Sequence, residues 1–379
     1  MARDRGIDPM AYLPDMDVHR LARARRTAGT RGGVRLRRGD RGRRARRARG
    51  RPPFPEGFGA LLSSAAEPLL EELAAAARRA RRWFGSTAYL FTPLYLANYC
   101  DNHCVYCGFN RDNDICRARL DRAGIVAELD AIAATGLEEI LLLTGEDRAH
   151  RPLLHRRRGV LAAERFRMVG VEVYPMNEDE YAYLHECGVD YVTVFQETYD
   201  PALYGKLHLA GRKRVFPYRA NAQERAMRGG MRGAAFGALL GLGDFRRDAF
   251  ACGLHAWLVQ RAYPHAELSL SCPACAHRRE RVAGAARGRA PAAAGDVRLP
   301  AAAAGHHHLV ARARGLPRPG HGHAATKISA GVSAVVGEHA DGSTAGDDQF
   351  EIADGRDVAQ VRAALRASAS TVMNDYVRL

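Results

Sequence analysis

Short apolar runs alternate with amphipathic stretches along most of this chain of 379 residues, and this alternation is the feature that most restricts its fold. The runs have strand character, whereas the stretches between several of them, such as AGIVAELDAIAATG at 123–136, place apolar residues at helical spacing. A repeated order of strand and helix favours parallel strands joined by crossover helices. The sequence therefore predicts an α/β fold, a (β/α)8 barrel of the TIM type.

Seven strands of this barrel can be identified. They are expected at 87–99, 138–145, 168–176, 191–199, 234–243, 266–272 and 325–333. The seventh position in the ring falls between 280 and 325, where HHHLVARA is only a poor strand candidate, so disruption is expected there. Loss of that strand would open the barrel and expose unpaired edges. Residues 54–83 predict helices that precede the barrel, which itself is expected to span 84–379.

The formal net charge of +15 comes almost entirely from the N-terminal segment. Residues 20–51 contain 15 arginines and a single acid, Asp40. An arginine-rich arm attracts phosphates, but this one has no interleaved aromatic residues and no periodic apolar face. We therefore expect residues 1–53 to be disordered, and binding to nucleic acid is the less favoured interpretation.

A second tract, residues 274–325, contains no Phe, Tyr, Trp, Ile or Met. Two interpretations stay open: a low-complexity insertion, or a stretch of a GC-rich gene translated out of frame, which yields Arg, Ala, Gly, Pro and His. Reading the nucleotide sequence in its other frames separates them. A milder patch of the same kind lies at 147–160.

Three cysteines follow the first predicted strand as Cys-x-x-x-Cys-x-x-Cys: Cys100, Cys104 and Cys107. A loop of this kind can give thiolates to three irons of a 4Fe-4S cubane and leave the fourth iron open for chemistry. Gly108 lets the backbone turn away close to such a cluster. The alternative is a structural zinc site, with a second pair from Cys272 and Cys275. The scattered Cys116, Cys187 and Cys252 are expected to be buried, inert thiols.

The triad, with Tyr106 before its third cysteine, resembles the radical S-adenosylmethionine (SAM) superfamily. The longer strings YCGFNRDN, VFQETY, HLAG and SAG resemble its tyrosine lyases, the 2-iminoacetate synthases of thiamine biosynthesis, over 84–146, 165–273 and 326–379. The resemblance implies a 4Fe-4S cluster and SAM as cofactors. It also implies that Gly145 and Glu146, after the second strand, bind the SAM amino group, although a strand that ends in Gly-Glu is common in any barrel.

Further site residues follow from the ends of later strands. Gln196 and Glu197 end the fourth strand, where they would contact ribose hydroxyls or substrate, or only cap the strand. Gly237 and Gly241 resemble the strand of the family that packs on adenine, but glycines there also allow tight packing. Tyr106 is expected near the cluster or the adenine. Relatives carry a Gln-Phe pair near the barrel mouth, here Gln349 and Phe350, and core packing is the favoured role of Phe350.

The resemblance implies cleavage of SAM to a 5'-deoxyadenosyl radical, which takes hydrogen from L-tyrosine, so that Cα–Cβ cleavage gives 2-iminoacetate and p-cresol. Implied partners are a flavodoxin or ferredoxin as electron donor and thiazole synthase. Another aromatic amino acid lyase, for tryptophan or of the hydrogenase-maturation type, and an inactive iron-sulfur protein are the alternatives. One departure bears on activity: the family has Pro-Arg-x-x-Pro after the sixth strand, whereas Ala274 follows Pro273 here. The lack of a long apolar run or signal-peptide core predicts a cytoplasmic protein without membrane contact.

Overall fold

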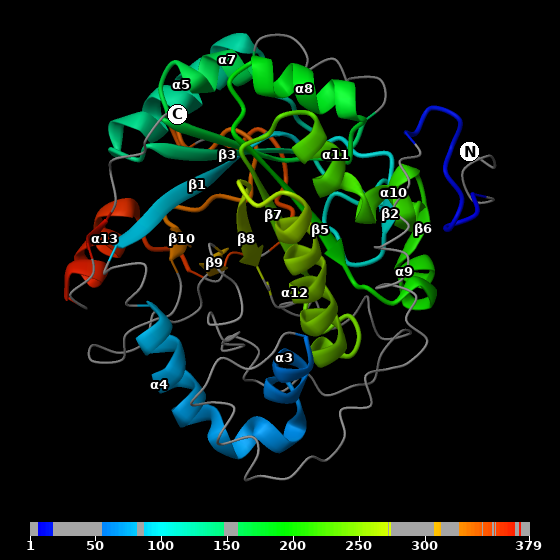
Figure 1. Ribbon diagram of the computed structural model, residues 1–379. Coiled ribbons are helices and arrows are strands. Elements are labelled where there is room, and N and C mark those ends of the chain that lie inside the picture. Colours follow the sequence, from blue (N-terminus) through cyan, green and yellow to red (C-terminus); the bar gives the residue numbers. More distant parts are fainter. Residues whose placement is uncertain are drawn as a thin grey trace.

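The structure of the chain is a computed structural model, drawn as a ribbon in Figure 1. It describes residues 7–17, 55–81, 87–147, 158–271, 273, 307–311, 326–342, 344–350, 352, 354–367 and 371–372. The whole arginine-rich stretch 20–51 and most of the tract at 274–325 therefore lie outside the described residues, as do Cys272 and Cys275.

Eight parallel strands close into a ring among the described residues. In order around the ring they are β1 (Thr87–Ala97), β3 (Glu139–Thr144), β4 (Met168–Glu172), β5 (Tyr191–Glu197), β7 (Gly233–Ala238), β8 (Glu267–Ser271), β9 (His307–Ala311) and β10 (Lys327–Ser329). Pairing of β10 with β1 closes the ring, and the short β11 (Thr371–Val372) pairs only with the start of β1. The predicted (β/α)8 barrel and its seven identified strands are confirmed.

The seventh position of the ring is filled by β9, within the weak candidate HHHLVARA. Its backbone pairs with β8 on one side and with β10 on the other. The expected disruption of this strand is wrong for the described residues, because backbone pairing on both sides outweighs the poor strand propensity of a histidine-rich run.

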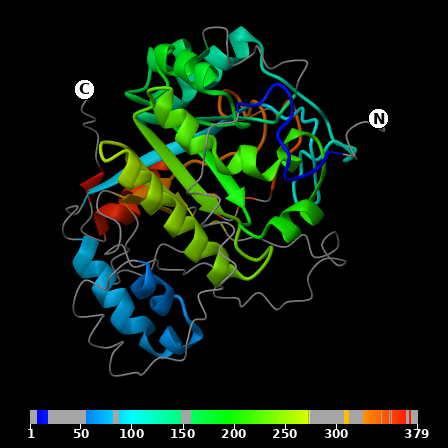
Figure 2. The same ribbon diagram turned by 45° about the vertical axis from the view of Figure 1, so that its right-hand side comes forward.

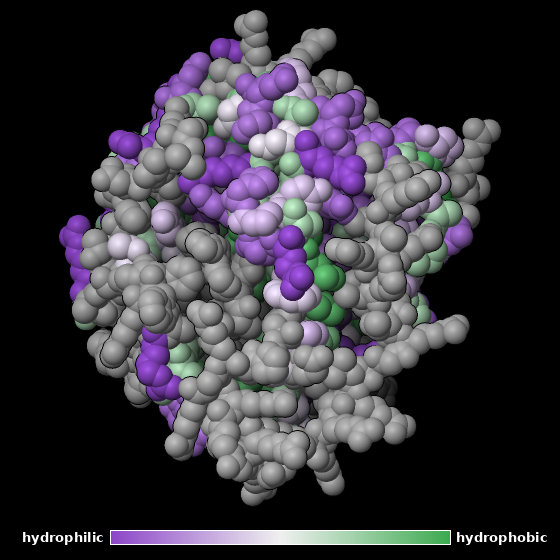
Figure 3. Space-filling view, viewed as in Figure 1, coloured by the Kyte–Doolittle hydropathy of each residue, from purple (hydrophilic) through white to green (hydrophobic). Residues whose placement is uncertain are grey.

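Helices cover the outside of the ring, as Figure 1 shows. The longer ones that follow strands are α5 (Arg122–Ala134), α7 (Arg158–Ala163), α8 (Glu178–Glu186), α9 (Pro201–Leu207), α11 (Ala222–Arg228), α12 (Phe245–Ala262) and α13 (Val358–Ala367). Side chains that precede several of them satisfy their first N–H groups: Asp121 caps α5, Asp244 caps α12, and Asn177 forms a capping box with Glu180. Where side chains are coloured, the helices at the top of Figure 3 turn mostly hydrophilic residues outward, as expected for helices with one buried side.

An ion pair fills the amino-terminal end of the barrel lumen. Lys327 Nζ pairs with the fully buried Glu139, whose Oε1 also accepts a 2.6 Å hydrogen bond from the Tyr191 hydroxyl. These side chains come from β10, β3 and β5 and meet inside the ring. A Cβ at Gly170 would lie 2.2 Å from the Tyr191 ring, so packing is tight there. Because this end is filled, chemistry is left to the carboxyl ends of the strands.

The predicted N-terminal helices are α3 (Glu56–Leu61), the 3-10 helix η1 (Ser64–Leu69) and α4 (Leu70–Arg81). Figures 1 and 2 show α3 beside one end of α12. Phe58 stacks on Phe250 with ring centroids 5.8 Å apart, and a Cβ at Gly253 would lie 2.6 Å from the Phe58 ring. The helices over 54–83 are thus confirmed, and α3 is attached through aromatic packing on α12.

Residues 7–17 correct the expectation of disorder for the whole of 1–53. Met16 is buried and packs with Tyr218 of α10 (Phe216–Ala220), while Tyr12 meets the same ring edge-on at 6.3 Å. The Phe216 backbone N–H donates to the Pro9 carbonyl at 2.8 Å. An apolar anchor and backbone bonds therefore order this part of the segment, which an average over an arginine-rich stretch conceals.

Three further expectations can be compared with the structure. Phe350 is 37% exposed, so the prediction that it packs in the core is wrong. Cys252 is fully buried as expected, but Cys116 is exposed and Cys187 is half-buried. Among the described residues, no helix is both long and apolar enough to cross a membrane.

Candidate functional site

The cysteine loop begins where β1 ends, at the carboxyl end of the barrel. It packs directly against the turn after β3, because a Cβ at Gly145 would lie 2.2 Å from the Tyr99 carbonyl oxygen and 3.0 Å from Cys100 Cβ. The Asp101 N–H also donates to the Glu146 carbonyl at 2.7 Å. A glycine is therefore required at position 145 for close approach, in addition to any contact with a ligand.

The HLAG string holds the other side of the loop. The short strands β2 (His103–Cys104) and β6 (His208–Ala210) pair in antiparallel fashion, and the Val105 N–H donates to the Leu207 carbonyl at 3.0 Å. His208 Nδ1 lies 2.8 Å from the Tyr204 carbonyl, which can only accept, so this nitrogen carries the proton. His208 Nε2 therefore accepts from the Tyr106 hydroxyl at 2.8 Å. Burial, with nearby positive charge, holds the pKa of His208 well below its usual value, which keeps the ring neutral.

The C-terminal segment closes the loop from a third direction. The Gly108 N–H donates to the Gln349 carbonyl at 3.0 Å, and a Cβ on Gly108 would lie 2.4 Å from that oxygen. The Gln349 side chain donates to Cys107 Sγ at 3.5 Å and accepts from the Tyr95 hydroxyl at 2.7 Å. The expected place of Gln349 at the barrel mouth is therefore observed, and its amide contacts a cysteine sulfur.

The three thiols of the triad are close enough to influence each other's ionisation. Burial, then the neighbouring Cys107, raises the pKa of Cys100 to about 11. Burial also raises the pKa of Cys104, and Cys107 and Cys100 add to this, against the opposing charge of Lys213. Such thiols are protonated at neutral pH, so binding a metal must release protons. Three sulfurs gathered on one loop, with Asn102 and Gln349 amides donating to two of them, fit the ligands of a cluster.

A site for a single metal ion is not formed by the described residues, since no three His, Cys, Asp or Glu side chains converge on one point. A zinc ion needs about four ligands within roughly 2.3 Å of one centre. Cys272 and Cys275, which the zinc alternative requires, lie outside the described residues.

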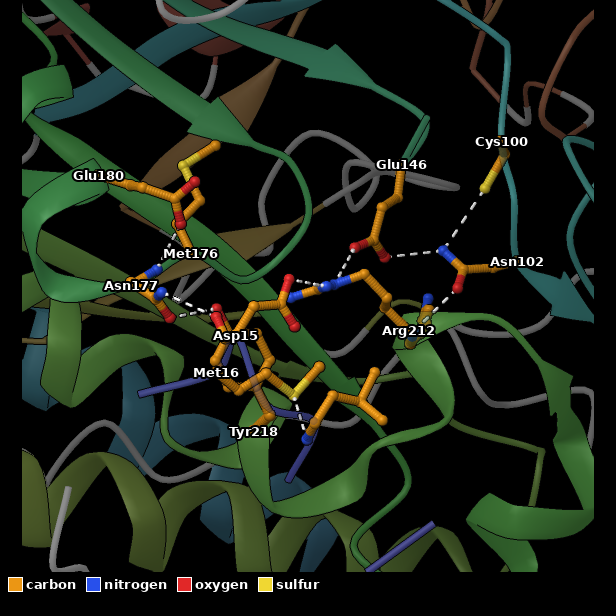
Figure 4. A network of polar contacts seen from close by, with 12 residues as sticks. Asp15, Met16, Cys100, Asn102, Glu146, Met176, Asn177, Glu180, Arg212 and Tyr218 are labelled. Carbon is orange, nitrogen blue, oxygen red and sulfur yellow. Dashed lines mark hydrogen bonds and ion pairs between the residues drawn. The ribbon is translucent and has the colours of Figure 1, made fainter. Parts of the chain in front are cut away.

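Glu146 belongs to a buried polar network, drawn in Figure 4. Its Oε2 accepts a 2.9 Å hydrogen bond from Asn102 Nδ2, which also lies 3.6 Å from Cys100 Sγ. Its Oε1 lies 3.6 Å from Arg212 Nε, close enough for an ion pair but too far for a hydrogen bond. The structure thus places Glu146 and Gly145 next to the first cysteine, and their contact with the SAM amino group stays a prediction.

Glu197 is the only residue other than glycine with a positive φ among the described residues, at 68°. Lys213 Nζ lies 2.7 Å from its Oε1, and Arg219 Nη2 lies 3.6 Å from the same oxygen. Burial would raise the pKa of Glu197, but Lys213 and Arg219 outweigh it and leave the pKa below its usual value. The result is a buried, ionised carboxylate in a strained conformation at the end of β5, a combination typical of binding sites.

Two neutral polar groups at the same end of the barrel have unsatisfied hydrogen-bonding capacity. Both polar atoms of the Gln196 side chain and the hydroxyl of Ser271 are buried and make no hydrogen bond in the described structure. Ser271 pairs with Gly237, and Gly237 with Phe195, whereas Gln196 lies at the irregularity in register between Phe195 and Glu197. Buried polar atoms without partners are rare and are commonly completed by water or a ligand.

The two glycines predicted to pack on adenine have different surroundings. A Cβ at Gly237 would lie 2.3 Å from the Phe195 ring, so the space beside this glycine is taken by an aromatic side chain. Gly241 has a φ of 105° in the turn after β7, which requires glycine. Both positions thus have a structural reason to be glycine, and contact with adenine stays a prediction.

Sequence reasoning missed several residues that the structure adds to the site. They are Asn102, Arg212, Lys213 and Arg219. The available signal was the basic string RKRVFPYR that follows HLAG. In sequence these charges are typical of a solvated surface. In the structure Lys213 and Arg219 lie at Glu197, and Arg212 lies at Glu146.

Comparison with known proteins agrees with this arrangement. Residues 94–249 match the sequence model of a family described as the Radical SAM superfamily. The 2-iminoacetate synthase of Escherichia coli (strain K12) is 42% identical over 217 residues, which are 56% of this chain and 58% of that protein. The chain therefore matches little more than half the length of this curated relative.

Solved structures share the fold. A crystal structure of HydG, a maturase of the FeFe-hydrogenase, superposes with a TM-score of 0.81 over 94% of this chain and 80% of that one, at 21% identity. Methylornithine synthase (PylB) superposes with a TM-score of 0.66 over 87% of this chain and 97% of that one, at 20% identity. At these identities the likeness concerns the fold alone. The part that matches the family model, residues 94–249, includes the cysteine loop at the barrel mouth.

Proposed function

We propose that this chain is a radical SAM lyase of the 2-iminoacetate synthase type, which cleaves the Cα–Cβ bond of L-tyrosine to 2-iminoacetate and p-cresol. The observation that carries the proposal is the triad of Cys100, Cys104 and Cys107 held on three sides at the mouth of a barrel. The identity of 42% to a 2-iminoacetate synthase supports the choice of reaction.

The three cysteines would hold a 4Fe-4S cluster, which supplies the electron for SAM cleavage when it is bound. Asn102 and Gln349 orient two of the sulfurs through their amide N–H groups, at 3.6 and 3.5 Å. Tyr106 packs the loop onto His208, with rings edge-on at 5.6 Å. Tyr106 is therefore assigned to holding the loop against β6, beside any contact it makes with a ligand.

Two buried carboxylates would bind opposite ends of SAM. Glu146 offers an anionic oxygen to the ammonium group, since Arg212 stays 3.6 Å from it and makes no hydrogen bond to it. Glu197 would accept from ribose hydroxyls, and Lys213 keeps it ionised so that it can only accept. Gly237 and Gly241 lie on and after β7, the next strand of the ring, where adenine is proposed to pack.

The substrate would occupy the lumen beneath the cysteine loop. Gln196 and Ser271, at the carboxyl ends of β5 and β8, have buried polar atoms without partners in the described structure, and both are candidates to contact L-tyrosine. The filled amino-terminal end, with Glu139 and Lys327, closes the far side against water. Thiazole synthase would receive the imine product for thiamine synthesis, and a flavodoxin or ferredoxin would deliver electrons.

Product formation tests this proposal. The chain, reconstituted with iron and sulfide under anaerobic conditions and reduced, should form 5'-deoxyadenosine and p-cresol from SAM and L-tyrosine. Tryptophan in place of tyrosine should give neither p-cresol nor a matching amount of indole product. Formation of 5'-deoxyadenosine with tryptophan-derived products alone would instead assign the chain to another aromatic amino acid lyase.

A further inference from the structure

The N-terminal segment 7–17 reaches the proposed SAM site, as the close view in Figure 4 shows. Asp15 forms an ion pair with Arg212 Nη1, and Asn177 Nδ2 donates to the Asp15 carbonyl at 3.1 Å. The Asp17 N–H donates to Asn177 Oδ1 at 3.0 Å, and Asp17 Oδ2 accepts from the Glu178 N–H at 3.1 Å. The start of α8 therefore fixes the backbone on both sides of Met16, and this fixes the position of the Asp15 carboxylate.

Arg212 lies between two carboxylates but hydrogen-bonds to only one of them. Its Nη1 contacts Asp15, whose side chain is 58% exposed, whereas Arg212 and Glu146 are almost fully buried. Its Nε and Nη2 are buried and make no hydrogen bond in the described structure. A guanidinium with unused donors 3.6 Å from a buried carboxylate would gain by moving onto it, because paired N–H donors to a carboxylate make the strongest ion pairs.

The carboxylate of Glu146 must stay accessible if it is to bind an ammonium group. Asn102 already uses its Oε2, so Oε1 is the oxygen that remains for a cationic ligand. An arginine closed onto Oε1 would occupy that oxygen and neutralise its charge. The ion pair with Asp15 holds the Arg212 guanidinium short of this closed position, with its Nε 3.6 Å from Glu146 Oε1.

We propose that Asp15 is a positioning residue for cosubstrate binding: its ion pair holds Arg212 away from Glu146 and so keeps Glu146 available to the ammonium group of SAM. This inference rests on the proposed function, in which Glu146 binds that group. It gives residues 7–17 a role in the site, in contrast to the disordered N-terminus that composition suggests.

The test is equilibrium binding of SAM to the anaerobically reconstituted chain and to two matched variants. Asp15→Asn should raise the Kd for SAM about tenfold, since the charged contact that restrains Arg212 is lost. Asp17→Asn removes the same charge from the same segment, but its carboxylate contacts the Glu178 backbone, so the Kd should stay within about twofold. Asp15→Glu should restore most of the affinity. Iron content and the unfolding midpoint should be unchanged in Asp15→Asn, because Asp15 is half exposed.

A double variant tests the route of the effect. In an Arg212→Met background, Asp15→Asn should no longer change the Kd, because the arginine that it restrains is gone. Two results would overturn the inference: an equal loss of affinity from Asp15→Asn and Asp17→Asn, or a full Asp15→Asn effect in the Arg212→Met background. Neither result would affect the proposed function as long as the unmodified chain binds SAM. No SAM binding by the unmodified chain would overturn both.

Discussion

Replacing Gly145 with alanine should displace the cysteine loop without unfolding the barrel. The new Cβ would lie 2.2 Å from the Tyr99 carbonyl oxygen, whereas ordinary contacts begin at 3.4 Å, so the backbone at Tyr99 must retreat by about 1 Å. Cys100 is the next residue, and its sulfur moves with it. Overpacking of this kind costs about 1–3 kcal/mol of unfolding free energy, and a displacement of that size takes one of three cluster ligands out of reach.

The assay combines urea unfolding of the cluster-free chain with iron content after reconstitution. Gly145→Ala should lower the unfolding free energy by about 1–3 kcal/mol and lose most of the bound iron. Gly355→Ala is the matched control, because a Cβ there meets nothing within 4 Å. If Gly145→Ala binds as much iron as Gly355→Ala and unfolds at the same urea concentration, the close approach of the two loops does not position the cysteine loop.

The strands and the cysteine loop were predictable because their signals are local. A run such as EILLLT shows its strand character within six residues, and three cysteines in eight residues show their chemistry without the fold. The small sheet of β2 and β6 was not predictable, since strands of two and three residues have no periodicity. The roles of Arg212 and Lys213 were not predictable either, because they depend on ion pairs with Glu146 and Glu197, which the fold brings together.

Two expectations were wrong because they rested on averages over many residues, which concealed the contacts of single side chains. The disorder expected for 1–53 came from the arginines of 20–51, while Met16 and Tyr12 provide an apolar anchor before that stretch. The core position expected for Phe350 came from the usual preference of phenylalanine, yet its backbone neighbour Gln349 is the residue held at Cys107. In both places a contact across the fold outweighs composition.

Two further predictions concern stability. Lys327→Met should lower the unfolding free energy by about 3–5 kcal/mol, because it leaves the fully buried Glu139 without its counter-charge; urea unfolding checks this, and the double variant with Glu139→Gln should recover most of the loss. Burial, with Asp200 and Asp244 nearby, raises the pKa of Asp248 to about 6, against hydrogen bonds from the Tyr199 N–H and the Thr198 hydroxyl. Because the folded pKa lies above the unfolded value, the contribution of Asp248 to stability is full below about pH 4 and is lost as the pH rises through 6. In the cluster-free chain, the unfolding free energy relative to Asp248→Asn should therefore fall by about 3 kcal/mol from pH 4 to pH 8, and a constant difference would refute the assignment.

The central claim is that Cys100, Cys104 and Cys107 together hold an iron-sulfur cluster. The direct measurement is iron and acid-labile sulfide per chain after anaerobic reconstitution of the unmodified protein, the three single Cys→Ser variants and Cys116→Ser, an exposed cysteine outside the triad. The account predicts about four irons per chain for the unmodified protein and for Cys116→Ser, with a severe loss in each triad variant. Full iron and sulfide content in any one of the three triad variants would contradict it.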